Sequence, residues 1–292
     1  MRLIKHKTIM KYFTPFLLII LLLYQSCKKM DINEGVPSYI NIPRIEIVTD
    51  PTNEGSNSHK ITDVWVYFDN NLQGVYPLPA TFPVLLSGKQ HISIKAGIKN
   101  NGIAATRTKY PFYDYYKEEI LLTKDSTTNI DTTVTYVDNA SFIIEDFDES
   151  VNHFIFSKTN NSDTTFLQNN DTVFEVNSAG IHLAPPHLTF EVATNEVHEM
   201  PKLGTPVYVE LDYKCNTPFQ VGVIANYPQT VSTHSIVTIN PKSEWNKIYI
   251  DLTSAIINTN NADFHKIFIS MKRDINSTEI AKLYLDNFKI VY

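Results

Sequence analysis

The stretch Asp63-Val-Trp-Val-Tyr-Phe68 predicts the fold of the first half of the chain. Successive side chains of a β-strand point to opposite faces, so both valines and Phe68 share one face, opposite Trp65 and Tyr67. β-Branched and aromatic residues in this alternation favour a strand that packs on a core. The stretch therefore predicts a strand with one buried face, which we place at Ile61 to Phe68.

Similar short segments lie on both sides of this strand, separated by turn residues. Asp69-Asn-Asn-Leu-Gln-Gly74 supplies a hairpin connection directly after it. The other strands that we predict in this half are Ile42 to Val48, Gly74 to Leu78, His91 to Ile98, Glu118 to Leu122 and Thr132 to Val137. Regularly spaced short strands without helical periodicity predict an all-β sandwich, which we assign to residues 39–138.

A second, differently patterned set of strands begins at Ser141. Its members are Phe142 to Glu149, Thr172 to Val176, Leu188 to Ala193, Val207 to Lys214, Phe219 to Ala225, His234 to Ile239, Asn246 to Asp251, His265 to Met271 and Leu283 to Val291. The spacing excludes βαβ units, and only Thr253 to Asn258 reads as a helical turn or short helix. We therefore predict an all-β protein with two β-sandwich domains, the second a jelly roll over 139–292.

Two parts of the sequence resemble known families. Val66 to Ile98, with Leu85-Leu-Ser-Gly-Lys-Gln-His91, resembles the small β-sandwich modules of the PEGA and carboxypeptidase-regulatory type, which implies a structural or adhesive module. Ile144-Glu-Asp-Phe-Asp148, Ser243 to Thr253 and Leu283 to Ile290 are similar to the jelly-roll carbohydrate-binding and galactose-binding-like families. These motifs imply a fold more than a ligand.

The beginning of the chain predicts export. A basic segment without acids, Met1 to Lys11, precedes the apolar run Phe16 to Leu23, which is shorter than the roughly 17 to 25 residues of a membrane-spanning helix. Ser26-Cys27 then resembles the lipobox of Bacteroidota-type lipoproteins, which implies a signal peptide over 1–26, lipidation of Cys27 and a tether over 27–38. An ordinary secretory signal is the alternative. The resemblance implies anchoring to the outer membrane, with the surface and periplasmic faces both open.

Composition narrows the partners of the protein. A net charge of -6 and a pI near 5.8 argue against nucleic-acid binding. The chain has two cysteines, so lipidation of Cys27 leaves Cys215 without a disulfide partner. We predict a buried thiol at a strand end for Cys215.

An aromatic segment follows the Asn101-Gly102 turn. Its rings are Tyr110, Phe112, Tyr113, Tyr115 and Tyr116, and Pro111 excludes a central strand. One interpretation is a long loop held to the sandwich by aromatic anchors. The other is a partner-binding surface that includes Arg107, because tyrosine and arginine are enriched in binding hot spots.

Two further candidate sites lie in the second half. The jelly-roll resemblance implies that Glu145 and Asp286 bind a structural calcium ion. Calcium needs six to eight oxygen ligands, of which these two carboxylates would supply some. The alternative for both residues is a hydrogen-bonded carboxylate at a strand edge. Tyr227, in Ala-Asn-Tyr-Pro, is the candidate ring for stacking on a sugar.

Catalytic motifs are missing from the sequence. It contains neither Gly-x-Ser-x-Gly nor His-Glu-x-x-His. We therefore predict a non-enzymatic, lipid-anchored outer-membrane protein that acts as an accessory or interaction subunit of an envelope complex for uptake, secretion or outer-membrane protein assembly. The alternatives are a surface glycan-binding lipoprotein and a hydrolase with an unrecognised site.

Overall fold

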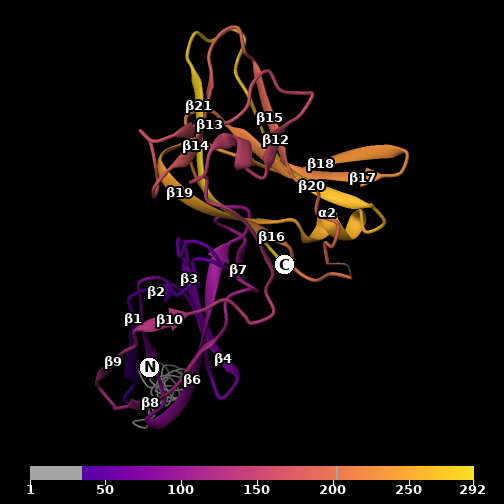
Figure 1. Ribbon diagram of the computed structural model, residues 1–292. Helices are drawn as coiled ribbons and strands as arrows, with labels where there is room; N and C mark the ends of the chain where they lie inside the picture. The colour runs from indigo at the N-terminus through magenta and orange to yellow at the C-terminus, as the bar shows by residue number, and fades with distance from the viewer. Residues whose placement is uncertain (1–34, 202) are drawn as a thin grey trace, which may run out of the picture. The chain divides into compact units, whose positions relative to one another are not determined.

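The computed structural model describes residues 35–201 and 203–292, which form β-strands joined by turns and loops, with very little helix (Figure 1). The expected signal peptide, Cys27 and the expected tether as far as residue 34 lie outside the described residues. Ser38, the last residue of the expected tether, already belongs to the first strand. Within the described part, no helix has the length and apolar character needed to cross a membrane.

Three sheets build the N-terminal sandwich. Its strands are β1 (Ser38–Ile42), β2 (Ile45–Ile47), β3 (Asp63–Phe68), β4 (Asn71–Pro77), β5 (Ala80–Val84), β6 (Gly88–Lys99), β7 (Arg107–Lys109), β8 (Tyr116–Leu122), β9 (Thr127–Asn129) and β10 (Thr132–Val134). The largest sheet has the order β4-β3-β6-β7, with β8 also paired to β6, and the smaller sheets have the orders β5-β1-β9 and β10-β2.

The predicted strand at the start of this half is confirmed as β3. Its valines are fully buried and Phe68 nearly so, whereas Trp65 and Tyr67 lie on the opposite face and are half-buried. Asp69 and Asn70 both have positive φ angles, 47° and 67°, and connect β3 to β4 as a two-residue hairpin turn. Turns of this hand match the twist of the two strands.

The structure also corrects the strand boundaries of this half. The strand expected from Ile42 to Val48 is divided at Pro43 into β1 and β2, which belong to different sheets. β5 was missed because it contains Pro83. This proline is tolerated because β5 is the outer strand of its sheet, where one side of the backbone needs no partner.

Two sheets build the C-terminal sandwich. Its strands are β11 (Phe142–Glu145), β12 (Phe156–Lys158), β13 (Leu167–Asn169), β14 (Ser178–Leu183), β15 (Thr189–Thr194), β16 (Tyr208–Cys215), β17 (Phe219–Tyr227), β18 (Thr230–Ile239), β19 (Lys242–Asp251), β20 (Phe264–Lys272) and β21 (Ala281–Val291). One sheet has the strand order β13-β14-β21-β16-β19, with β11 also paired to β21, and we call it the β21 sheet. The other has the order β12-β15-β20-β17-β18, and we call it the β17 sheet.

The two sheets enclose one apolar core, as expected for a jelly roll. The only helices in the described residues are the 3-10 turn η1 (Val151–His153) and α2 (Thr253–Asn258), and α2 is the short helix predicted from the sequence. The predicted all-β fold with two sandwiches is confirmed. The strand expected from Thr172 to Val176 is wrong, since the neighbouring Ser178–Leu183 forms β14 instead.

The two sandwiches share buried side chains. Tyr208, Tyr249 and Val291 come from strands of the β21 sheet but pack in the core of the N-terminal sandwich. Residues 38–292 accordingly form one unit by their contacts. The boundary that we expected between residues 138 and 139 stays a prediction.

Candidate functional site

A polar groove crosses the outer face of the β17 sheet. Val221 and Val223 of β17 point into the core, so Ile224 and Asn226, at the alternate positions, point outward. On the neighbouring strand β20, Ile267 packs in the core, and the preceding residue, Lys266, lines the groove. The alternation of polar and apolar residues in these strands therefore produces the site.

The groove has a volume of about 540 Å³ and a predominantly hydrogen-bonding lining. Amides, hydroxyls, the Glu191 carboxylate and lysine side chains line it, together with Ile224 and Val231. Glu191 is held in place because its Oε1 accepts hydrogen bonds from Thr159 Oγ1 at 2.7 Å and Asn161 Nδ2 at 2.8 Å. Donors and acceptors thus meet in one open depression.

One amide in the groove has unused hydrogen-bonding capacity. The Nδ2 atom of Asn226 is buried and has no hydrogen-bond partner within residues 35–201 and 203–292. Leaving a buried donor unpaired costs about 1–3 kcal/mol. A ligand oxygen that reached this atom would remove that cost.

A glycine keeps the same outer face flat beside the groove. Gly222 of β17 is opposite Phe268 of β20, and the ring lies against the glycine backbone. A Cβ atom at this position would collide with both the ring and the His234 carbonyl oxygen. Phe268 is buried on this face even though it points away from the core of the sandwich.

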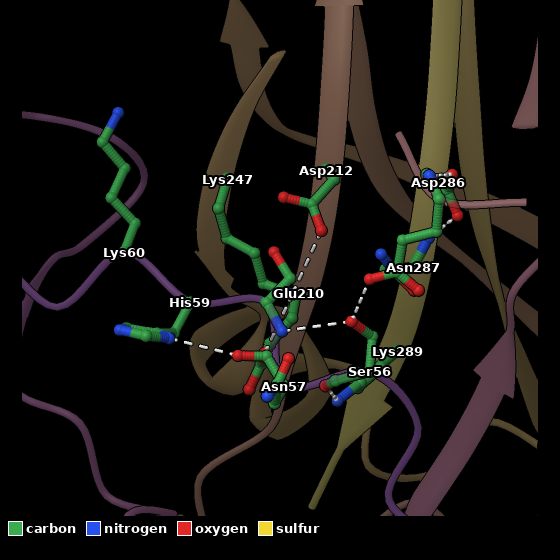
Figure 2. Close-up of polar contacts among 12 residues, drawn as sticks. Ser56, Asn57, His59, Lys60, Glu210, Asp212, Lys247, Asp286, Asn287 and Lys289 are labelled. Carbon is green, nitrogen blue, oxygen red and sulfur yellow. Dashed lines mark hydrogen bonds and ion pairs between the residues drawn. The ribbon is translucent and has the colours of Figure 1, made fainter. Parts of the chain in front are cut away.

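A second polar cluster is buried where the β21 sheet packs against the N-terminal sandwich (Figure 2). Val209 and Leu211 of β16 point into the C-terminal core, so Glu210 points to the opposite face. The strand register places Glu210 between Tyr249 of β19 and Lys289 of β21. We call this cluster the junction.

Glu210 is the centre of the junction. Its Oε1 accepts hydrogen bonds from the hydroxyls of Tyr110 at 2.7 Å and Tyr136 at 2.8 Å, both from the N-terminal sandwich. The ammonium of Lys247 lies 3.4 Å from Glu210 Oε2 and 3.6 Å from Asp212 Oδ2. Burial lowers the pKa of Lys247, but the two carboxylates outweigh it and the net shift is upward.

Further contacts extend the junction across the two sandwiches. Lys289 Nζ donates to the Ser56 carbonyl at 2.6 Å, and the hydroxyls of Tyr113 and Tyr249 are 3.0 Å apart. Burial lowers the pKa of Lys289 to about 8, against the opposing effect of Glu210. Because these buried side chains contact one another across both sandwiches, the junction holds the sandwiches together.

The structure separates the residues of the predicted aromatic partner surface. Tyr110 and Tyr113 are 0% exposed and Phe112 is 6% exposed. The expectation of a contact surface is therefore corrected for these three rings, because they anchor the loop in the junction. Tyr115 is 37% exposed and Tyr116 is half-buried, so these two rings still reach solvent.

Arg107 lies at the surface but already has a partner. Its guanidinium forms an ion pair with the buried carboxylate of Asp63. Lys95, whose ammonium donates to the Tyr113 carbonyl, also lies 4.8 Å from the centre of the Tyr115 ring. Of the predicted surface, only Arg107, Tyr115 and Tyr116 thus remain accessible to solvent.

Glu145 and Asp286 are both held by hydrogen-bond donors. Glu145 accepts from the backbone amides of Phe147 at 2.9 Å and Ile155 at 2.7 Å. Asp286 accepts from the Ser178 hydroxyl at 2.7 Å and from two backbone amides. Burial raises the pKa of both carboxyls, that of Asp286 to about 7.

These surroundings fit hydrogen-bonded carboxylates better than ligands of calcium, which needs oxygen atoms. β11 does lie beside β21, with Glu145 opposite Phe288. In the described residues, however, no group of three or more His, Cys, Asp or Glu side chains could hold a metal ion. The calcium site stays a prediction.

The remaining predicted residues lie away from the groove. Tyr227, the candidate sugar-stacking ring, is half-buried at the hairpin between β17 and β18 and does not line the groove. Cys215 is a free, buried cysteine at the end of β16, which confirms its predicted role as a strand-end thiol. Sequence reasoning missed Glu191 and Asn226, whose only signal was a polar residue at alternate positions of an apolar strand.

Comparisons with known proteins give distant structural similarities only. Neither a protein-family model nor a curated protein matches the sequence. A carbohydrate-binding module of the β-sandwich superfamily is 12% identical over 79% of this chain and 85% of its own, with a TM-score of 0.37. A family 11 carbohydrate-binding module from Clostridium thermocellum, in complex with a β-1,3-1,4-mixed-linked tetrasaccharide, is 12% identical over 52% of this chain and 94% of its own (TM-score 0.36). A CBM28 module specific for non-crystalline cellulose is 9% identical over 49% and 90%, also with a TM-score of 0.36. Similarity at these scores is too low to support an inference about function.

Proposed function

We propose that the protein binds glycans without catalysis and that the groove of the β17 sheet holds a neutral oligosaccharide. The observation that carries this proposal is the lining of the groove, which includes both Asn226, whose buried amide nitrogen has no hydrogen-bond partner within residues 35–201 and 203–292, and Glu191, whose carboxylate is fixed by two donors. Sugar hydroxyls both donate and accept hydrogen bonds, so they match a mixture of amide and carboxylate groups.

The size and polarity of the groove support this choice of ligand. Its volume of about 540 Å³ lies within the range of about 300–1,000 Å³ that is usual for small-molecule sites. Ile224 and Val231 supply apolar contact area for the carbon-bound faces of a sugar ring. No aromatic ring in the described part of the chain lines the groove, so we expect hydrogen bonds to dominate the binding.

Calorimetric titration of the full chain with oligosaccharides tests the proposal. The panel contains cello-, xylo-, manno- and malto-hexaose, with the protein kept in a detergent that carries no sugar. We expect saturable binding of at least one member and a loss of about tenfold or more in affinity for each of Asn226→Ala and Glu191→Ala, because each removes a hydrogen-bonding partner.

The matched control is Gln220→Ala, on the same strand and the same face of β17 but outside the groove. It should leave the affinity unchanged. Absence of binding across the panel, or equal affinities for the wild type and the Asn226→Ala/Glu191→Ala double variant, would reject the groove as the site. Chromatography of the titrated sugar checks for turnover, and a cleaved product would favour the hydrolase alternative.

Lipid anchoring at Cys27 and an outer-membrane location belong to the same proposal. They rest on Ser26-Cys27 at the end of the apolar run. An anchor raises the local concentration of a weak binding site at the membrane. Cys27→Ser should abolish incorporation of radiolabelled palmitate and move the protein out of the membrane fraction, and continued labelling would contradict the proposal.

A role as an accessory subunit of an envelope complex is the second candidate function. It is favoured by the outer face of the largest N-terminal sheet, where Tyr67 and Tyr115 meet edge to face at 6.2 Å and Lys109 lies 5.5 Å from the Trp65 ring. Aromatic side chains are enriched at protein interfaces. A pull-down in mild detergent should recover a stoichiometric membrane partner that Tyr115→Ala releases, whereas recovery of the protein alone would count against this role.

A further inference from the structure

A cavity lined by lysines lies where the N-terminal sandwich meets β19. Its volume is about 180 Å³, and its walls include Lys60, Lys99, Lys242 and Lys247. Lys60 and Lys247 are labelled in Figure 2, next to the junction. The cavity and the groove of the β17 sheet share no lining residue.

Backbone contacts bring these lysines together from segments far apart in the sequence. Lys99 ends β6 and Lys242 begins β19. The turn after Lys99 is fixed to β19 because the amide of Asn101 donates to the Tyr249 carbonyl at 2.8 Å. The amide of Lys60 donates to the Tyr249 hydroxyl at 3.0 Å, which places this residue beside the same strand. The cations are therefore positioned by the fold and are not scattered along a flexible surface.

The charges around the cavity are unbalanced. Lys247 is paired with Glu210 and Asp212, so its charge is already compensated. Lys60, Lys99 and Lys242 make no ion pair with any residue in the described part of the chain. The lining contains no acid. A protein with a net charge of -6 thus concentrates uncompensated positive charge around one cavity, on side chains that still reach solvent.

The lysines around the cavity repel one another, which lowers the pKa of Lys60. Burial lowers the pKa of Lys60, and the neighbouring charges of Lys242 and Lys99 lower it further. Lys60 also donates a hydrogen bond to Asn246, so its ammonium is held inside the cluster. An anion bound among these groups would replace repulsion with attraction.

We propose that this cavity binds an oxoanion, a sulfate or phosphate group that is either free or carried by a larger ligand. Lysine ammonium groups bind such groups as point charges, and charge-assisted hydrogen bonds are the stronger kind. Lys60 and Lys99 belong to the N-terminal sandwich and Lys242 to the C-terminal one. The bound anion therefore connects the two sandwiches.

Calorimetry and thermal unfolding of the full chain test this proposal. The probes are inorganic phosphate and inorganic sulfate, each titrated at constant ionic strength set with sodium chloride. We expect one saturable site per chain and an increase in melting temperature, since a ligand that binds only the folded state stabilises it. The Lys60→Gln/Lys242→Gln variant should lose about tenfold or more in affinity for the anion.

The matched control is Lys124→Gln, an exposed lysine in the turn between β8 and β9 that undergoes the same change of charge. It should bind the anion like the wild type. Without anion, the double variant should melt no lower than Lys124→Gln, because it removes repulsion and no ion pair. That comparison separates loss of the site from loss of the fold.

Three results would overturn the proposal. These are equal affinities for the double variant and Lys124→Gln, a thermal shift that chloride reproduces at the same ionic strength, and no saturable binding of either anion. Glucose 6-phosphate and glucose 6-sulfate identify the source of the group: tighter binding than the inorganic ions indicates a sugar ester, and equal binding indicates the free ion. Asn226→Ala should leave the anion site unchanged, so the two sites can fail independently.

Discussion

Replacing Glu210 with glutamine should weaken the contact between the two sandwiches. The change keeps the shape of the side chain but removes its charge. The hydroxyls of Tyr110 and Tyr136 then donate to a neutral amide, and Lys247 keeps only Asp212, at 3.6 Å, as a partner. The substitution therefore perturbs electrostatics at the junction with little change in packing.

The expected loss follows from these contacts. A hydrogen bond to a charged group contributes about 1.5–3 kcal/mol and one to a neutral group about 0.5–1.5 kcal/mol, so the two tyrosine bonds together weaken by about 2 kcal/mol. Breaking a buried ion pair by removing one partner costs about 3–5 kcal/mol, and the partner that Lys247 retains reduces this part. We expect Glu210→Gln to lower the free energy of unfolding by about 3–5 kcal/mol in all.

Urea denaturation at pH 7 with tryptophan fluorescence measures both the loss and its location. The chain has two tryptophans, Trp65 in the N-terminal sandwich and Trp245 in the C-terminal one. Trp65→Phe and Trp245→Phe backgrounds each report on one sandwich. We expect coincident transitions with intact Glu210 and separate transitions with Glu210→Gln, because the sandwiches then unfold with less mutual stabilisation.

Glu244→Gln is the control, since Glu244 is exposed on β19 and undergoes the same chemical change. It should alter stability by less than about 0.5 kcal/mol. A loss below about 1 kcal/mol for Glu210→Gln, with both tryptophan probes still coincident, would refute the role given to the junction.

Three other predictions concern single side chains. Between about pH 4 and pH 7 the folded protein keeps a proton on Asp286 that the unfolded chain has lost, so the contribution of this group to stability falls as pH rises, and Asp286→Asn should flatten that slope in denaturation series. Gly222→Ala should cost about 1–3 kcal/mol or more in urea denaturation, because its Cβ would collide with the His234 carbonyl. Tyr110→Ala should cost about 3–5 kcal/mol in the same assay, as for other buried rings, whereas Tyr115→Ala should cost less than about 1 kcal/mol.

Each of these predictions has a result that contradicts it. An unchanged pH slope for Asp286→Asn would mean that this carboxyl does not control the pH dependence. Gly35→Ala is the control for the glycine change, since no atom of the described residues lies within 4 Å of a Cβ added there, and equal effects at Gly35 and Gly222 would reject the packing argument. Equal losses for Tyr110→Ala and Tyr115→Ala would contradict the placement of the buried ring in the junction.

Most strands could be predicted from the sequence because the alternation of buried and exposed residues in a strand is visible within a few consecutive residues. The alternation in β3 was predicted, and the turn at Asp69 and Asn70 lies within the hairpin connection that we predicted over Asp69 to Gly74. β14 was missed because Ser178 and Gly180 give it low strand propensity. Its place in the sheet is decided by pairing with β21, which no local pattern records.

The candidate sites were harder to predict because they combine distant segments. In β16, Glu210 and Asp212 alternate with apolar residues and suggest a solvent-exposed face, yet the N-terminal sandwich covers that face. The rings of Tyr110 and Tyr113 were identified as unusual, but only their tertiary contacts decide between anchor and partner surface. Similarly, Glu191 and Asn226 lie on strands that are joined through β20, a pairing that the sequence does not reveal.

The position of β21 affects how the protein can be made. This strand is the last of the described strands in chain order, yet it lies inside its sheet, with β14 and β11 on one side and β16 on the other. When a chain emerges N-terminus first, β14 and β16 remain without their shared neighbour until Ala281–Val291 have appeared. Unpaired strand edges of this kind promote aggregation during synthesis. The β21 sheet therefore stays divided into two parts until Ala281–Val291 pair with β14 and β16.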